Sequence, residues 1–237
     1  MILSKSRKFI FLRVPKTAST SLQRQILESI PYEEIDLHTQ VDTYDSTGPD
    51  KIPEDSYLYK CKYPHEEIPP VFSAINAHPN LADLIKHKVL SYDEIFEYRV
   101  YGVMRDPIDR LISQAQHSFS QLTFDPPLTN ALALSSFFQV LENKIIDEKS
   151  GMMLQHRNPG LYNGQVHWVR YNGRRINRLF KFENISKLLE EITGETELKY
   201  NHRSYYRRVK EVQIPPELAQ EVRRRYPEDF ALWESLS

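Results

Sequence analysis

The chain has 237 residues, of which 40% are hydrophobic and 27% charged, the proportions of a globular protein large enough to bury a core. Its formal net charge of −1 excludes a chain-wide basic field that would recruit nucleic acid or an anionic membrane. Neither is therefore expected as a partner, and any anion site must be local.

The single cysteine, Cys61, excludes an intrachain disulfide and predicts a reducing compartment. Residues 1–13 alternate charged and apolar side chains too quickly for the apolar core of a signal peptide. No apolar run approaches the roughly 20 residues needed to span a bilayer. We therefore expect a soluble, cytoplasmic protein.

Strand-like and helix-like patterns alternate along the chain, which is typical of an α/β fold with a mainly parallel central sheet flanked by helices. The expected strands are 8–14, 57–63, 71–75, 99–104 and 178–182, and the expected helices are 19–29, 81–87, 107–119, 135–147, 185–192 and 216–236. The length fits one domain over residues 1–237, because no segment has the composition of a linker.

The segment Arg-Val-Pro-Lys-Thr-Ala-Ser-Thr-Ser at residues 13–21 joins the first strand to the first helix. A helix N-terminus offers unpaired N–H groups and a partial positive charge, the hydroxyls donate hydrogen bonds, and Lys16 adds a full charge. These features predict a site for a phosphate or sulfate ester. The candidate ligand-binding residues are Lys16, Thr17, Ala18, Ser19, Thr20 and Ser21.

This segment has no glycine, and its lysine stands early in the loop. The nucleoside-triphosphate loop, G-x-x-x-x-G-K-[ST], instead uses glycines to wrap the phosphates and ends on Lys-Ser/Thr. The difference argues against an ATPase or kinase. A P-loop small-molecule kinase and a non-catalytic nucleotide-binding protein of the same fold remain the alternatives.

A second motif, Arg-Asp-Pro-Ile-Asp-Arg-Leu-Ile-Ser, covers residues 105–113 directly after a predicted strand. Asp106 is a favourable N-cap, and Pro107 occupies the first helical position, where proline is tolerated. Helical spacing allows Arg105 and Ser113 to face the same groove. A bidentate guanidinium with a hydroxyl suits a phosphate monoester.

Both motifs resemble those of sulfotransferases that use 3′-phosphoadenosine 5′-phosphosulfate (PAPS). Residues 13–21 are most similar to the 5′-phosphosulfate loop of the carbohydrate branch, the heparan sulfate 2-O- and 6-O-sulfotransferases. Residues 105–113 resemble the family's R-[DH]-P-x-x-R-x-x-S signature, which implies that Arg105 and Ser113 hold the 3′-phosphate. The resemblance implies a P-loop-like three-layer fold and metal-free transfer of a sulfuryl group to an acceptor hydroxyl, on a saccharide, leaving PAP.

The resemblance also implies a general base. In the heparan sulfate enzymes a histidine in the interval that here contains His78 takes the acceptor proton, and His78 follows a predicted strand. Histidine titrates near neutrality, as a base for this step should. Glu66 is the alternative base. Lys16 is the expected catalytic cation, neutralising charge that develops on the bridging oxygen.

Weaker candidates complete the expected site. Arg203 and Ser204, in a basic and aromatic segment, are further candidate nucleotide contacts, and Arg13, His156 and Arg157 are candidates for acceptor recognition. Gln165 is a further candidate for acceptor recognition, and the segment around Asp229 is expected to contribute packing alone. Because animal Golgi members of the family are membrane-anchored, the missing span favours a bacterial or viral protein. The oligomeric state is left open.

Overall fold

The computed structural model describes residues 1–38, 78–118, 135, 163–199 and 214–236. The chain divides into two compact units: unit 1 comprises Met1–Met104 and His167–Asn201, and unit 2 comprises Arg105–Val166 and His202–Ser237. That residues 1–237 form one domain stays a prediction.

Unit 1 is built on a five-stranded sheet with the order β3-β1-β2-β4-β7. Its strands are β1 (Ile2–Ser4), β2 (Phe9–Phe11), β3 (Leu37–His38), β4 (Arg99–Met104) and β7 (Arg178–Lys181). β4 pairs in parallel with both β2 and β7, whereas β1 is antiparallel to β2 and β3. The expected parallel centre is confirmed, and β1 and β3 add an antiparallel edge that was not predicted.

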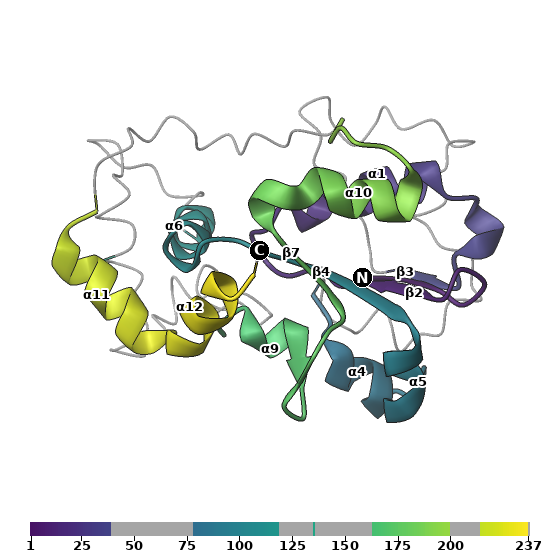
Figure 1. The fold of residues 1–237 in the computed structure, drawn as a ribbon, viewed down its shortest axis with the longest axis horizontal. Helices are drawn as coiled ribbons and strands as arrows, with labels where there is room; N and C mark the ends of the chain where they lie inside the picture. The colour runs from purple at the N-terminus through teal and green to yellow at the C-terminus, as the bar shows by residue number, and fades with distance from the viewer. Residues whose placement is uncertain (39–77, 119–134, 136–162, 200–213, 237) are drawn as a thin grey trace, which may run out of the picture. The chain divides into compact units, whose positions relative to one another are not determined.

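Helices cover the sheet of unit 1. α1 (Ser19–Ser29) and α10 (Ile185–Thr193) pack against each other, and in Figure 1 α4 (Leu81–Lys86) and α5 (Tyr92–Glu97) lie on the opposite side of the strands. Apolar side chains repeat at helical spacing on α1 and α10, so each helix presents one face to the sheet. The resulting core includes Phe9, Phe11, Leu22, Ile26, Leu27, Tyr101, Val103, Leu188 and Leu189.

Short elements complete unit 1. They are η1 (Tyr32–Glu34), α9 (Val166–Val169), whose first residue belongs to unit 2, β5 (Arg170–Tyr171), β6 (Arg174–Arg175) and η4 (Phe182–Asn184). β5 and β6 form an antiparallel hairpin around Asn172 and Gly173, which both have positive φ. Asn-Gly is the preferred sequence for such two-residue turns.

Unit 2 contains α6 (Pro107–Ser118), α11 (Pro216–Arg225) and α12 (Pro227–Glu234). Leu111, Ala115, Val222 and Phe230 form its buried core. The prediction of one helix over 216–236 is wrong, because Tyr226 leaves the helical region just before Pro227. Proline disfavours the helical conformation of the residue before it and then starts the next helix favourably.

Other predicted elements agree closely with the structure. The expected helix 19–29 and strand 99–104 coincide with α1 and β4, and α4, α6 and α10 each differ by one residue at the C-terminus. The predicted strands 57–63 and 71–75 lie outside the described residues, as does the predicted helix 135–147 apart from residue 135. None of the described helices is long and apolar enough to span a membrane.

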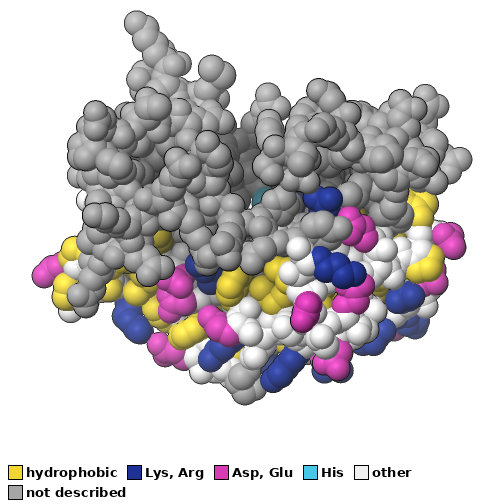
Figure 2. All heavy atoms as spheres, turned by 90° about the horizontal axis from the view of Figure 1, so that it is seen from above, with side chains coloured by type: hydrophobic (Ala, Val, Ile, Leu, Met, Phe, Trp, Pro, Cys, Tyr) yellow, Lys and Arg dark blue, Asp and Glu magenta, His cyan; other side chains and the backbone are white. Residues whose placement is uncertain are grey.

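Charged side chains of both signs are interspersed on the described part of the surface visible in Figure 2. Salt bridges between neighbouring residues contribute to this pattern, for example Lys199 with Glu195 at 2.8 Å and Arg223 with Glu234 at 3.1 Å. The mixture agrees with the near-zero net charge of the whole chain.

Candidate functional site

The loop that follows β2 turns without glycine. The N–H of Leu12 still bonds to the carbonyl of Tyr101 on β4 at 2.9 Å, and the chain then turns into α1. Lys16 (φ 67°) and Ala18 (φ 56°) both adopt the left-handed conformation, which costs about 1–2 kcal/mol for a residue with a Cβ. Such strained residues cluster at ligand-binding turns.

The helix that this loop opens has no side-chain cap among the described residues. Its N-cap position is held by Ala18, which has no side-chain acceptor, and α1 begins directly at Ser19. The N–H groups of a first turn normally need a cap, water or a ligand. A strained turn, a lysine and an uncapped 11-residue helix are together suited to an anion.

The hydroxyl groups of the loop differ in their contacts. The Thr17 hydroxyl is buried and donates to the Val14 carbonyl at 2.9 Å, which braces the turn. The Thr20 hydroxyl accepts a hydrogen bond from Nη2 of Arg13 at 2.9 Å and keeps its own proton to donate. Ser19 and Ser21 are buried.

Arg13 is fully buried, and its side chain supports Thr20. A guanidinium in this position braces the loop from within. This placement favours a structural role for Arg13 over the predicted contact with an acceptor.

His78 belongs to the same unit and is tied to the loop. Its Nδ1 lies 2.9 Å from the backbone carbonyl oxygen of Arg13, and because a carbonyl can only accept, Nδ1 carries the proton. Desolvation of the ring, followed by the positive charge of Arg13, holds the pKa of His78 well below its usual value, although the bond to the carbonyl raises it. The neutral ring therefore has its lone pair on Nε2, as a general base requires.

A second contact fixes the backbone of His78. The indole N–H of Trp168, on α9, donates to the carbonyl of His78 at 3.0 Å, and Trp168 is buried. No local sequence pattern indicates this contact. Trp168 and the Arg13 carbonyl together restrain both the main chain and the ring of His78.

The start of α4 lies just beyond His78. Asn80 and Asp83 form a reciprocal capping box, with distances of 3.1 and 2.8 Å between each side chain and the other residue's backbone N–H. The Asn80 amide also lies 2.9 Å from Nε2 of His167, a second histidine near this site that was not predicted. The Asn-x-x-Asp spacing was the available signal for the cap.

In unit 2, the second motif starts α6 as predicted. Oδ1 of Asp106 accepts hydrogen bonds from the N–H groups of Ile108 at 2.9 Å and Asp109 at 3.0 Å, so Asp106 caps the helix. The Arg105 side chain is 28% exposed, and its Nη2 lies 3.8 Å from the Asp109 carboxylate. Ser113 is half-buried on α6.

Gln165 is fully buried in unit 2 and contacts Arg105. Its amide oxygen accepts from the Arg105 N–H at 2.9 Å, and its amide nitrogen donates to the Arg105 carbonyl at 2.8 Å. The expectation that Gln165 recognises the acceptor is therefore wrong, because its side-chain amide is engaged by the backbone of the 105–113 motif.

The predicted site residues are thus divided between the units. Lys16 and His78 lie in unit 1, and Arg105 and Ser113 lie in unit 2. Four candidate ligand-binding residues and the alternative base lie outside the described residues: His156, Arg157, Arg203, Ser204 and Glu66.

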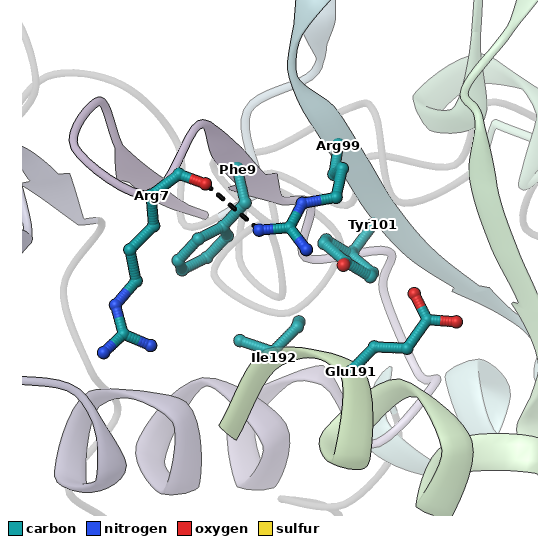
Figure 3. Close-up of a pocket in the computed structure, with 6 residues that line it drawn as sticks. All are labelled: Arg7, Phe9, Arg99, Tyr101, Glu191 and Ile192. Atoms are coloured by element: carbon teal, nitrogen blue, oxygen red, sulfur yellow. Dashed lines mark hydrogen bonds between the residues drawn. The ribbon is translucent and has the colours of Figure 1, made fainter. Parts of the chain in front are cut away.

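A pocket of about 190 Å³ in unit 1 lies away from the motif residues (Figure 3). It is lined by Arg7, Phe9, Arg99, Tyr101, Glu191 and Ile192. Phe9 and Arg99 are the first residues of β2 and β4, whereas the motifs follow the last residues of these strands. Arg7 pairs with Glu34, and Glu191 lies 3.5 Å from Arg178, so two of the lining charges are compensated.

Comparison with known proteins identifies a family. The family model described as "Sulfotransferase family" matches residues 1–234. No curated protein and no solved structure matches the chain. In the described part of the chain, no group of three His, Cys, Asp or Glu side chains could hold a metal ion.

Proposed function

The chain belongs to the sulfotransferase family, and from this premise we propose that it transfers a sulfuryl group from PAPS to a hydroxyl group of a saccharide, releasing PAP. One observation carries the proposal most strongly: Lys16 lies in a strained, glycine-free turn that opens the uncapped helix α1. A P-loop-like three-layer fold is part of the same proposal.

The two charged ends of the donor would bind to different motifs. Lys16 and the first turn of α1, with the hydroxyl proton of Thr20, would bind the 5′-phosphosulfate. Arg105 and Ser113 would bind the 3′-phosphate, because a partly exposed guanidinium and a hydroxyl suit a phosphate monoester. Arg203 and Ser204 remain further candidates for the nucleotide.

Two side chains would carry out the chemistry. His78 accepts the proton of the acceptor hydroxyl on Nε2 as the oxygen attacks sulfur. Lys16 stabilises the negative charge that develops on the oxygen bridging sulfur and phosphorus as that bond breaks. By analogy with phosphoryl transfer, the remaining catalysis is positioning of the two reacting groups in line.

The saccharide acceptor is supported by the sequence of residues 13–21, which resembles that of the carbohydrate sulfotransferases. His156 and Arg157 are the remaining candidates for its recognition. A kinase is not favoured, because its loop should contain the Gly-Lys-Ser/Thr ending that this chain lacks.

Two parallel transfer assays test the proposal. The purified protein is incubated with radiolabelled PAPS or γ-labelled ATP, each with polysaccharides, oligosaccharides, phenols and peptides as acceptors. We expect label from PAPS on a saccharide and none from ATP. Transfer from ATP alone contradicts the sulfotransferase assignment, and transfer from PAPS to a phenol or peptide alone contradicts the saccharide acceptor.

A further inference from the structure

The backbone of Arg105 is held by a side chain that is 60 residues away in sequence. Gln165 pairs with it in both directions, accepting from its N–H at 2.9 Å and donating to its carbonyl at 2.8 Å. The carboxamide thus takes the place that a neighbouring strand would take beside an extended residue. Arg105 itself lies between the last residue of β4 and the N-cap of α6.

A second layer of contacts holds Gln165 in place. The Asp229 carboxylate accepts from the backbone N–H of Gln165 at 2.7 Å and from that of Val166 at 2.9 Å. Asp229 is buried, which raises its pKa, while the two N–H groups and the nearby Arg110 charge act in the opposite direction. These contacts fix the loop that carries Gln165.

Gly164 allows this approach. A Cβ at position 164 would lie 2.7 Å from an oxygen of Asp229, closer than two such atoms can pack. A residue with a side chain would therefore push the carboxylate away from the N–H groups that it accepts from. Gly164, Gln165 and Asp229 together form a support that ends at the Arg105 backbone.

We infer that Gln165 is a positioning residue, which sets the main-chain orientation of Arg105 so that its guanidinium can bind the 3′-phosphate of the donor. The inference depends on the proposed function, in which Arg105 binds this phosphate. A guanidinium forms two parallel hydrogen bonds to a phosphate only within a narrow range of directions. Restraining the backbone of Arg105 reduces the conformational freedom lost when it binds.

The test compares the binding of two nucleotides by calorimetry. PAP carries a 3′-phosphate and AMP does not, so the Kd of AMP divided by the Kd of PAP isolates the contribution of that phosphate. We expect Gln165→Leu to lower this ratio about tenfold, mainly by weakening PAP binding, because the loss of one charge-assisted hydrogen bond changes affinity by at least about this factor. In the Arg105→Ala background, Gln165→Leu should change the ratio no further.

A matched control separates positioning from general damage. Asn177 makes the same two-way contact at the other end of β4, accepting from the Val100 N–H and donating to the Tyr98 carbonyl, both at 2.8 Å. Asn177→Leu should lower thermal stability and leave the ratio of the AMP Kd to the PAP Kd unchanged. An equal fall of the ratio in Asn177→Leu and Gln165→Leu would overturn the inference.

If Gln165→Leu does not fold, a milder variant can be tested in its place. Gln165→Asn keeps a carboxamide but shortens the side chain by one methylene, so it cannot reach both backbone groups of Arg105. We expect a smaller fall of the ratio. Suppose that wild type prefers PAP over AMP and that Arg105→Ala loses that preference. An unchanged ratio in the folded Gln165 variants then overturns the role of Gln165, while the assignment of Arg105 stands. If wild type itself does not prefer PAP, the assignment of Arg105 in the proposed function fails.

Discussion

Nδ1 of His78 lies 2.9 Å from the carbonyl oxygen of Arg13, the residue at which the glycine-free loop begins. This bond fixes the proton on Nδ1 and leaves the lone pair on Nε2. The candidate base is thereby connected to the segment that contains Lys16. A change in the loop can therefore also affect the orientation of His78.

His78→Asn should strongly slow sulfuryl transfer while preserving PAP binding. The Asn amide can still donate to the Arg13 carbonyl but has no group equivalent to Nε2. General bases contribute about 10²–10⁴-fold to rate, so a loss in that range is expected. Initial rates with labelled PAPS and calorimetric Kd values for PAP provide the measurement. Full turnover by this variant would move the base to another residue, with Glu66 the next candidate.

Stability should fall on acidification through His78. Its pKa in the folded protein is lowered from about 6.5, so below that pH the unfolded chain binds a proton that the folded protein does not. The free energy of unfolding therefore decreases as pH falls below about 6.5 and levels off below the lowered pKa. Urea unfolding of wild type and His78→Asn between about pH 5 and pH 8 measures this. Identical pH dependence in the two proteins contradicts the shift.

Lys16→Gly should separate stability from activity. Glycine adopts the left-handed conformation of this position without the steric cost that lysine bears, so the melting temperature should not fall. Loss of the cation should lower transfer by about 100-fold or more. Lys88→Gly is the matched control, because Lys88 is also left-handed (φ 56°) but lies after α4 and outside both motifs. Unchanged turnover in Lys16→Gly contradicts the catalytic role of Lys16.

Trp168→Phe should affect catalysis through His78. Phenylalanine keeps most of the buried ring but leaves the His78 carbonyl without its indole donor, which costs about 1–3 kcal/mol of stability. We expect a lower kcat with little change in the Kd for PAP. Trp233→Phe, on α12, is the control and should retain the wild-type kcat. A normal kcat in Trp168→Phe shows that the anchor is dispensable.

Local patterns explain which parts of the structure could be predicted. The strand 99–104 and the helix 19–29 were found because alternating and helical hydrophobic spacing act within a few residues. The cap at Asp106 follows from its own short sequence. These features need no information from distant parts of the chain.

The remaining features depend on distant contacts or on unusual backbone geometry. Nothing in a glycine-free segment signals that Lys16 and Ala18 adopt positive φ. The pairing of Gln165 with Arg105 and the contact of Asp229 with Gln165 span 60 and 64 residues, so hydrophobic spacing could not show them. Local sequence alone therefore favours acceptor recognition for Gln165 and packing for Asp229, and does not indicate this pairing.

Calorimetric titration of the purified protein with PAP and, separately, with ATP measures which donor nucleotide the chain recognises, and it requires no knowledge of the acceptor. We expect PAP to bind at least about tenfold more tightly than ATP, equivalent to about 1.4 kcal/mol. We also expect Lys16→Gly and Arg105→Ala each to weaken the binding of PAP. Binding of ATP with no detectable binding of PAP would contradict the assignment.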